Sequence, residues 1–415
     1  MTSSARQPAP SRDDVSDSRS SRSGHDGKNR WAAVALVALA TFVVVAAEMM
    51  PVGLLTPIGT SLRESEGTIG LSLTITGLVA AITAPFVPIV TGRIDRRSTL
   101  IVLMLLVAGA NALTALSADF FTLALARVAL GVSMGGVWAL AAGFGPRLVR
   151  TRRIGLATTI IFSGIAFASV LGVPVGTYLG AAFTWNAAFW ALAGAATAIA
   201  LAMVIVLPSA PSSGPLPLRA LGVAFRVPGV RAGLALTILL VTAHFAAYTY
   251  VRPALEAFAG LDASLIATIL LVYGILGIAG NYASGPVAAI HPRIVVVILS
   301  LGIVGTLALF PVIATAAVTA GLVMAAWGLF YGGVSVSTQA WITHAAPELR
   351  EAVSALWVGA FNASIALGAF SGGQVLDGAG PRAVFWISAG IAAVALLLAA
   401  TGRLSVIRDP SRRRG

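Results

Sequence analysis

The sequence predicts an all-α integral membrane protein with twelve transmembrane helices, arranged as two six-helix halves related by pseudo-symmetry. Of its 415 residues, 58% are hydrophobic and 10% are charged, whereas soluble domains carry about 25% charged residues. Apolar runs of roughly 20 residues, the length that crosses a bilayer as a helix, recur along the chain. A stretch rich in Pro, Ser and Gly, at 208–230, separates these runs into two sets of six.

The twelve apolar runs give the expected spans in chain order. They lie at 31–55, 69–90, 99–118, 121–145, 154–177 and 185–207, and then at 231–251, 265–286, 294–313, 315–340, 352–375 and 383–402. The predicted organisation is therefore a disordered tail (1–30), an N-terminal half (31–207), a cytoplasmic linker (208–230), a C-terminal half (231–402) and a basic cytoplasmic tail (403–415). The first tail is expected to be disordered because it is rich in Ser, Arg and Asp and poor in apolar residues.

The positions of Lys and Arg predict the orientation in the membrane. Most of the 27 lie in the two tails, in the linker and in the loops after even-numbered spans. We therefore expect a multi-pass protein of the inner (plasma) membrane with both termini in the cytoplasm. A net charge of +12 is also typical of nucleic-acid binders, but a binding face would need basic residues clustered on a soluble domain. We expect no nucleic-acid partner.

Composition also limits the chemistry that the chain can perform. It has no cysteine, which excludes disulfides, thiol catalysis and Cys-ligated metals. Its four His are scattered and form no HExxH pattern. An ATP-driven pump would need a Gly-x4-Gly-Lys-Ser/Thr loop, and the sequence contains none. We expect no enzyme activity, no metal and no cofactor, so the energy source is a gradient.

Two charged residues stand inside otherwise apolar spans, Glu48 in the first and Arg127 in the fourth. A charge at such depth costs about 2.5 to 3.5 kcal/mol on insertion scales, so each needs a partner or an aqueous cavity. At 1.5 Å per residue, both groups and His244 of the seventh span lie about 10 Å below the outer surface. We expect Glu48 and Arg127 to meet. Three interpretations stay open: Arg127 is a structural charge satisfied by backbone carbonyls, it forms a static ion pair with Glu48, or the two form a proton relay in which Arg127 changes the proton affinity of Glu48.

Further polar and aromatic residues are candidates for lining a substrate cavity. Met134 shares a helix face with Arg127, and Tyr248 lies one turn after His244. The candidate set is His244, Tyr248, Met134, Trp138, Trp327, Tyr331, Asn281, Gln339 and Asn362. Aromatic faces in membranes also serve as packing surfaces or interface anchors, and His244 has a second interpretation as a neutral hydrogen-bonding residue. Both interpretations stay open.

Several motifs carry a resemblance to a known family. They are Glu48-Met-Met-Pro51-Val-Gly53-Leu-Leu55 in span one, Gly172-Val-Pro174-Val-Gly176 in span five, Thr242-Ala-His244-Phe-Ala-Ala-Tyr248 in span seven, and Gly92-Arg-Ile-Asp95-Arg96-Arg97 after span two. Together with the layout, they resemble the major facilitator superfamily, specifically its twelve-span drug:proton antiporter branch. Within it the chain is similar to bacterial sugar-efflux transporters related to arabinose exporters. The resemblance covers about residues 31–402.

The resemblance implies roles for two of these motifs. Gly172, Pro174 and Gly176 correspond to a variant of the antiporter motif, in which Pro permits bending and Gly permits close packing. The motif departs from the fuller Gly-Pro…Gly-Gly form. Gly92, Asp95, Arg96 and Arg97 correspond to an inside gating loop that latches the halves together in one state. This loop is compressed and lacks the second Gly of the family pattern.

The resemblance also implies proton-coupled efflux of small organic molecules by alternating access, with Glu48 carrying the proton and Arg127 modulating it. Met134 stands where the sugar-efflux pattern has His, so sugars and lipophilic drugs both remain candidate substrates. The expected partners are a small-molecule substrate, protons and the lipid bilayer, and we expect a monomer. An uptake symporter or uniporter of the same fold is the alternative.

Overall fold

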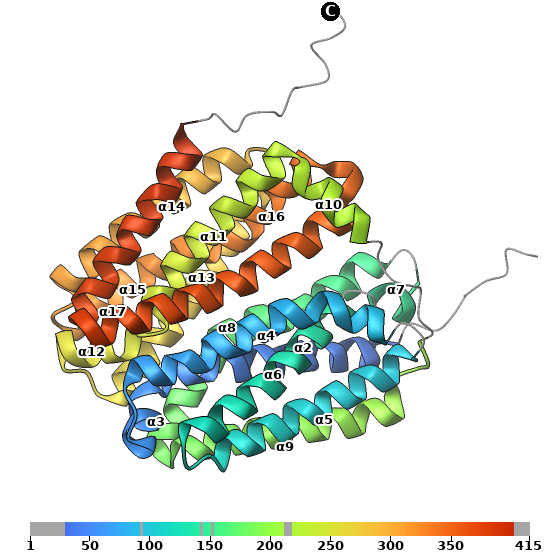
Figure 1. Ribbon diagram of the computed structural model, residues 1–415, viewed down its shortest axis with the longest axis horizontal. Helices are drawn as coiled ribbons and strands as arrows, with labels where there is room; N and C mark the ends of the chain where they lie inside the picture. Colours follow the sequence, from blue (N-terminus) through green and yellow to red (C-terminus); the bar gives the residue numbers. More distant parts are fainter. Residues whose placement is uncertain (1–29, 92–93, 142–143, 151–152, 211–217, 402–415) are drawn as a thin grey trace, which may run out of the picture.

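The computed structural model describes residues 30–91, 94–141, 144–150, 153–210 and 218–401 (Figure 1). All regular elements in these ranges are helices. The N-terminal half contains α2 (Trp31–Met49), η1 (Met50–Gly53), α3 (Leu55–Leu62), α4 (Glu66–Val90), α5 (Arg96–Ala115), α6 (Phe120–Ala141), α7 (Gly145–Leu148), α8 (Ile154–Ala182) and α9 (Trp185–Val206). The C-terminal half contains α10 (Leu218–Arg226), α11 (Pro228–Tyr248), α12 (Val251–Ala259), α13 (Ala263–Ala288), α14 (Pro292–Ile313), α15 (Ala317–Gly332), α16 (Val334–Ala345), η3 (Pro347–Leu349) and α17 (Arg350–Ala400).

Within these ranges, 11 helical stretches are long and apolar enough to cross a membrane. The last of them, α17, is 51 residues long and contains two of the expected spans. Inside it, Gly380 has φ 78° and ψ 173°, a conformation that residues with a side chain rarely adopt. Pro381 follows directly and cannot donate to the preceding turn. With this joint counted, each of the twelve expected spans corresponds to an observed helix.

Three spans are interrupted where the sequence predicted continuous helices. The first passes from α2 into the 3-10 helix η1, where Pro51 stands near the start. The seventh ends at Tyr248 and the chain restarts as α12, and the tenth breaks at Gly333 between α15 and α16. In the fourth, α6 is described as far as Ala141 and α7 begins at Gly145, and residues 142–143 lie outside the described structure.

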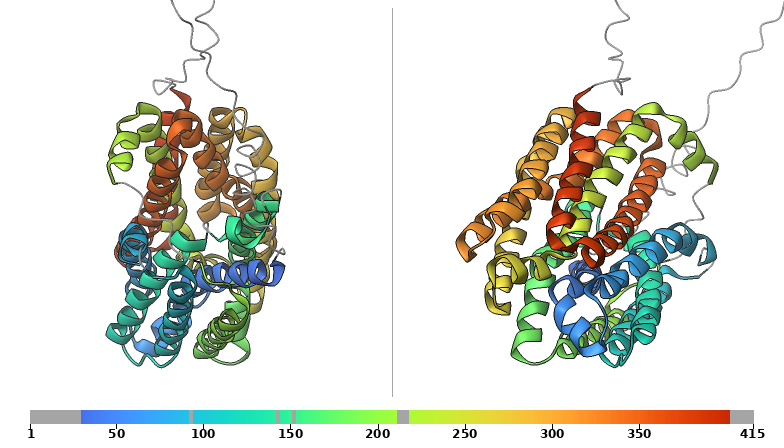
Figure 2. Two further views of the ribbon diagram at one scale, coloured as in Figure 1. Left: turned by 90° about the vertical axis from the view of Figure 1, so that its right-hand side faces the viewer. Right: turned by 60° about the vertical axis from the view of Figure 1, so that its left-hand side comes forward.

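The two halves form separate helix bundles that meet at one end of the molecule (Figures 1 and 2). Across the halves, α4 packs against α17 and α8 packs against α13. A glycine allows close approach in each pair: a Cβ on Gly77 would lie 3.1 Å from the carbonyl oxygen of Asn362, and one on Gly274 would lie 2.7 Å from the Cα of Val170. We call the end that carries α3 and α12 the α3–α12 end. The bundles diverge from it toward the end that carries α7 and α10 (Figure 1).

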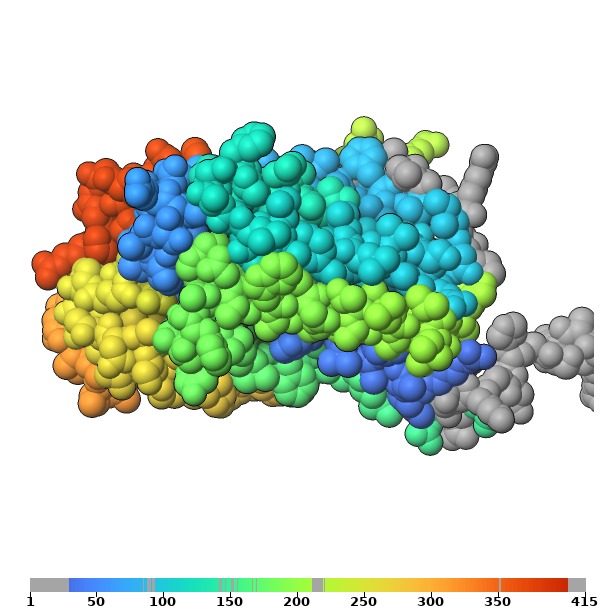
Figure 3. All heavy atoms as spheres, turned by 90° about the horizontal axis from the view of Figure 1, so that it is seen from below, coloured from blue at the N-terminus to red at the C-terminus, as the bar shows by residue number. Residues whose placement is uncertain are grey.

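The outer surface is apolar, as a lipid-facing surface must be. Figure 3 shows one face of the molecule, over which α5 and α9 lie side by side. On these two helices Val102, Leu201 and Ile205 are 62%, 61% and 85% exposed. Soluble monomers rarely expose contiguous apolar patches of this kind. Together with the length of the helices, this surface indicates a multi-pass membrane protein.

Parts of the predicted organisation fall outside the described residues. These are residues 1–29 and 403–415 of the two tails, residue 402 at the end of the last span, 211–217 of the linker, and Gly92 of the gating loop. The described end of the linker forms α10, a helix that the sequence analysis did not expect.

Candidate functional site

Glu48 and Arg127 are buried among apolar helices, with 3% and 1% of their surfaces exposed. Glu48 lies in the last turn of α2, and Arg127 lies two turns into α6. The Nη1 of Arg127 donates to the carbonyl oxygen of Ala47 at 3.0 Å. Its guanidinium also lies over the ring of Phe189, with Cζ 5.0 Å from the centroid, a distance typical of a cation–π contact.

A proline explains why the carbonyl of Ala47 is available to Arg127. In an α-helix that carbonyl would accept from the N–H of residue 51, but residue 51 is Pro51, which has no N–H. The N–H of Met50 makes the ordinary helical bond to the carbonyl of Ala46 and so does not reach Ala47. The proline that ends α2 therefore leaves one buried carbonyl without a backbone donor, and Arg127 provides the donor.

The expected contact between Glu48 and Arg127 is not formed. No nitrogen of Arg127 lies within 4.0 Å of the Glu48 carboxyl, although both residues are in the described part of the chain. Glu48 Oε1 and the Nε and Nη2 of Arg127 have no hydrogen-bond partner among the described residues. Buried polar atoms are almost always paired. The guanidinium of Arg127 thus binds the residue next to Glu48 and not the Glu48 carboxyl, and both side chains keep unused hydrogen-bonding capacity.

An aromatic cluster surrounds His244 in the C-terminal half. The ring of Tyr331 stacks on His244 with centroids 3.3 Å apart and planes 8° apart, and Tyr248 stacks at 4.9 Å and 20°. Trp327 meets His244 edge-on at 5.3 Å. The hydroxyl of Tyr273 lies 3.4 Å from His244 Nε2. The structure therefore brings together four of the predicted cavity residues, those of α11 and α15.

Tyr273 of α13 belongs to this cluster but was missed by the sequence analysis. It stacks on Tyr248 at 4.8 Å and meets Trp327 at 5.8 Å. Its signal in the sequence is weak: it stands eight positions before Asn281 in the same expected span, so the two share a helix face.

Three buried atoms of the cluster have no partner among the described residues: Nδ1 of His244, Nε1 of Trp327 and the hydroxyl of Tyr331. The Nε1 of Trp327 can only donate a hydrogen bond, and the hydroxyl of Tyr331 can both donate and accept. They come from two helices, α11 and α15, and sit within one group of stacked rings. Such an arrangement can hold a flat ring by stacking and orient it by hydrogen bonds.

The other predicted cavity residues lie apart from the aromatic cluster. Met134 is buried in α6, and Trp138 is half-buried and packs against Phe162 at 6.3 Å. Asn362 donates Nδ2 to the carbonyl of its own helix at Val358, 2.9 Å away, which leaves its Oδ1 unpartnered in the described structure. The remaining two, Asn281 and Gln339, are half-buried.

The described residues of the predicted gating loop bind their own half. Asp95 caps α5 by accepting from the backbone N–H of Arg97 at 2.8 Å, and it also accepts from the backbone N–H of Ala210 at 2.9 Å and from the hydroxyl of Ser209. Arg97 donates to the carbonyl of Val204. Desolvation raises the pKa of Asp95, but the hydrogen bonds from Ser209, Ala210 and Arg97 outweigh it and leave the pKa below its ordinary value. The loop thus ties α5 to the end of α9.

The span-five motif packs α8 against the first span at the level of Glu48. A Cβ on Gly172 would lie 3.1 Å from the Cα of Ala46, and one on Gly176 would lie 2.9 Å from Met50. Pro174 stands between them inside α8, which stays one continuous helix. The two glycines therefore let α8 approach the junction between α2 and η1 closely.

One spacing in α6 is also found in hydrolases. Gly131, Ser133 and Gly135 match the Gly-x-Ser-x-Gly pattern, but a nucleophile elbow needs a sharp strand-to-helix turn. Here the pattern lies inside a helix, where Ser133 donates to the carbonyl of Ala129 at 2.8 Å. The match carries no catalytic geometry.

Comparison with known proteins decides the family. The sequence model described as Major Facilitator Superfamily matches residues 37–355. The chain belongs to the major facilitator superfamily. The major facilitator fold predicted from the sequence is thereby confirmed, and membership indicates a membrane transporter rather than an enzyme.

One relative is 31% identical over 381 residues, covering 89% of this chain and 92% of its own length. It is named transcription regulatory protein OpdE, from Pseudomonas aeruginosa strain PAO1. Among solved major facilitator structures, a bacterial homolog of the human lysosomal transporter Spinster, inward-facing and occupied, matches with a TM-score of 0.74 and 13% identity, over 90% of this chain and 97% of its own. The human organic anion transporter MFSD10 (TETRAN) matches with a TM-score of 0.66 and 16% identity, over 90% of this chain and 100% of its own. At such identities these two show the fold alone.

Proposed function

We propose that this protein is a proton-coupled exporter of small organic molecules that works by alternating access. The observation that carries the proposal is the buried carboxyl of Glu48, which stands one residue from the carbonyl that binds Arg127. A carboxyl buried alone holds its proton, and a carboxyl paired with a guanidinium releases it. Movement of Arg127 from Ala47 to Glu48 would thus convert a conformational change into release of a proton.

The substrate would bind beside the aromatic cluster of α11, α13 and α15. Stacked rings with unpartnered donors, at His244, Trp327 and Tyr331, suit a sugar ring or a flat drug equally. The half-buried amides Asn281 and Gln339 would favour a sugar, and Met134 and Trp138 would favour a lipophilic drug. The gradient serves as the energy source, and no cofactor takes part.

In this proposal the protein lies in the plasma membrane as a monomer, with both termini in the cytoplasm. The α3–α12 end then faces outward and is closed, because the two halves are joined there. The described conformation would be inward-facing, as is the occupied Spinster homolog that shares the fold. Alternating access would open the α3–α12 end and bring the opposite ends of the bundles together.

The proposal is tested by proton flux in liposomes that hold a pH-sensitive dye. Purified protein is given a panel of pentoses, thiogalactosides, and cationic and neutral drugs, and wild type is compared with Glu48→Gln and Arg127→Ala. We expect a substrate-dependent proton flux opposite to substrate movement, abolished in Glu48→Gln. Flux in the same direction as the substrate would instead indicate uptake by symport. Substrate movement without proton flux, unchanged in Glu48→Gln, would show that the protein is a facilitator and that Glu48 carries no proton in transport.

The name of the Pseudomonas relative favours a second candidate function, control of transcription, since the two chains are 31% identical over almost their whole lengths. A membrane protein of this kind would sense a small molecule without moving it. The same liposomes separate the two functions, because a sensor binds a substrate from the panel but transports neither substrate nor protons.

A further inference from the structure

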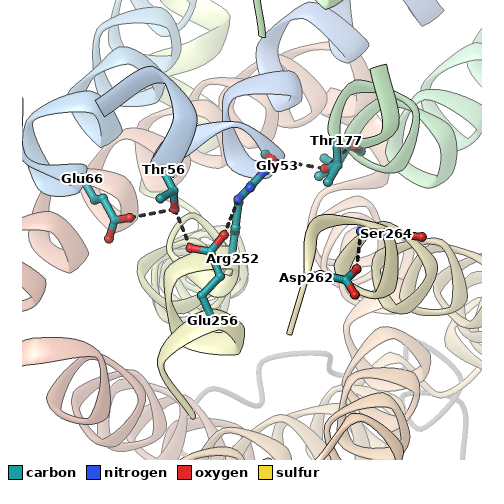
Figure 4. A network of polar contacts seen from close by, with 9 residues as sticks. Gly53, Thr56, Glu66, Thr177, Arg252, Glu256, Asp262 and Ser264 are labelled. Atoms are coloured by element: carbon teal, nitrogen blue, oxygen red, sulfur yellow. Dashed lines mark hydrogen bonds and ion pairs between the residues drawn. The ribbon is translucent and has the colours of Figure 1, made fainter. Parts of the chain in front are cut away.

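A polar network joins the two halves at the α3–α12 end (Figure 4). Arg252 of α12 donates Nη1 to the carbonyl oxygen of Gly53 in η1 at 2.5 Å, and Nε to Glu256 Oε1 at 2.8 Å. Thr177 of α8 donates to the same Gly53 carbonyl at 3.2 Å. The residue that would bond this carbonyl in a helix is Pro57, which has no N–H. The C-terminal half thus reaches a carbonyl that the N-terminal half leaves accessible.

The proton count in this network is the feature that carries our inference. The hydroxyl oxygen of Thr56 lies 2.7 Å from Glu66 Oε1 and 2.7 Å from Glu256 Oε2. A hydroxyl has one proton to donate, and an ionised carboxylate only accepts. Two contacts of this length therefore need a second proton, on one of the two carboxyls, which then donates to the Thr56 oxygen.

The neighbouring charges indicate which carboxyl holds that proton. Glu256 is paired with the Arg252 guanidinium at 2.8 Å. Glu66 has no cation within 4.0 Å in the described structure. The carboxyls of Glu256 and Asp377 oppose its ionisation, and the more distant guanidinium of Arg252 favours it. The Asp377 carboxyl accepts from Ser65 at 2.7 Å and from the backbone N–H of Gly67 at 3.2 Å. One guanidinium among three carboxyls, itself paired with Glu256, favours a proton on the half-buried Glu66, which has no ion-pair partner in the described structure.

We propose that a proton bound between Glu66 and Thr56 locks the α3–α12 end closed. Glu66 then donates to Thr56, Thr56 donates to Glu256, and Glu256 holds Arg252 against Gly53. Loss of the proton places two carboxylates on one hydroxyl, so one of the two contacts breaks. Because Glu66 and Thr56 belong to the N-terminal half and Glu256 to the C-terminal half, the broken contact is the one between the halves.

In transport, this proton would act at a different step from the one on Glu48, an assignment that rests on the proposed function. Once substrate has left at the open α3–α12 end, a proton arriving at Glu66 would close that end. The closure itself is independent of transport and can be measured without a substrate.

The experiment measures the distance between the halves at this end as the pH changes. The chain has no native cysteine, so a single pair can be introduced at two exposed positions, Ser61→Cys in α3 and Ala257→Cys in α12. Spin labels on this pair report the distance by double electron–electron resonance in lipid nanodiscs, from about pH 5 to about pH 9. We expect one short distance at low pH and a shift to a longer one as the pH rises.

In Glu66→Gln the pH response should be lost and the short distance should persist, because a neutral amide can donate to Thr56 at any pH. Asp377→Asn is the matched control: it removes another carboxyl that bonds across the halves but does not contact Thr56, and its pH response should remain. The inference is overturned if the distance in wild type does not change with pH. It is also overturned if the distance in Glu66→Gln responds to pH as in wild type, or if the distance in Asp377→Asn does not respond to pH.

The result is separable from a failure of the proposed function. Glu48→Gln in the labelled background should keep the pH-dependent distance although it abolishes proton flux. If the distance in wild type responds to pH but no substrate-dependent flux is found, only the transport proposal is refuted. The proton-dependent closure at Glu66 and Thr56 is then still supported.

Discussion

Arg127 donates to the carbonyl oxygen of Ala47 at 3.0 Å, one residue short of the carboxyl of Glu48. The acceptor exists because Pro51 has no N–H to bond it. A short movement of the guanidinium separates this arrangement from an ion pair. The proposed coupling therefore depends on competition between a carbonyl and a carboxylate for one cation.

Pro51→Ala tests that competition directly. The new N–H at residue 51 would bond the Ala47 carbonyl and release Arg127 toward Glu48. Hydrogen bonds to charged groups contribute about 1.5 to 3 kcal/mol, so we expect roughly a tenfold or greater loss of proton flux in the liposome assay. The loss should not add to that of Arg127→Ala in the double variant, because both act through one guanidinium. Additive losses would show that Pro51 acts elsewhere.

Tyr331→Phe separates stacking from hydrogen bonding in the aromatic cluster. The ring contact with His244 is kept and the unpartnered hydroxyl is removed. We expect thermal stability to stay unchanged, and substrate affinity by calorimetry to fall about tenfold, or 1.4 kcal/mol, if that hydroxyl binds the substrate. Tyr273→Phe is the matched control, because its hydroxyl already faces His244 at 3.4 Å. Equal affinity losses in both variants would contradict a specific role for Tyr331.

Thr56→Val should open the α3–α12 end at every pH. Valine has nearly the shape of threonine but cannot bridge Glu66 and Glu256, so the spin-label pair should report the longer distance throughout. Thr56→Ser restores a hydroxyl and should restore the pH response. A Val variant that stays closed at low pH would show that the bridge does not hold the halves.

Gly53→Ala should destabilise the packing of the N-terminal half. A Cβ at this position would overlap the hydroxyl of Thr177 and lie 2.9 Å from Val173. Overpacking of this kind typically costs about 1 to 3 kcal/mol, which lowers the melting temperature in a fluorescence-detected gel-filtration assay. Gly194→Ala in α9 is the control: nothing lies within 4 Å of its added Cβ, so it should be neutral or slightly stabilising. A melting temperature unchanged in Gly53→Ala would contradict the tight packing.

Asp95 gives a prediction about pH and stability. Its folded pKa lies below the ordinary value of 3.8, so the ionised form stabilises the fold above that pH and the stabilisation is lost as the pH falls through the folded pKa. Asp95→Asn should lower the melting temperature at neutral pH, and the difference from wild type should shrink below about pH 4. A difference that is constant with pH would mean that the charge of Asp95 contributes nothing.

Hydropathy predicted the membrane crossings well, because a bilayer selects helices by length and apolarity alone. It failed at the three interruptions. Those in the first and seventh spans lie beside Pro51 and Pro253, each of which removes one backbone hydrogen bond, and the one in the tenth lies at Gly333. The burial of Glu48, Arg127 and His244 was predicted from their isolation in apolar spans. The position of the Arg127 guanidinium was not, although Pro51, four residues after Ala47, was a readable signal.

The contacts of Thr56, Glu66 and Glu256 were beyond the sequence analysis for a different reason. The contact between Thr56 and Glu256 joins residues 200 positions apart, and periodicity within a helix carries no information about which ends of two halves touch. No role was predicted for Arg252. Its burial and its reach to Gly53 depend on how the halves dock.

The breaks after α2 and α11 have a mechanical consequence. These two helices carry the buried residues Glu48 and His244, whereas α3 and α12 carry groups that join the halves. A continuous helix transmits a push along its axis, but a jointed one absorbs it at the joint. The outer segments can therefore move apart while the inner ones keep their register. The contacts that join the halves at the surface can then break at a different time from proton release at Glu48.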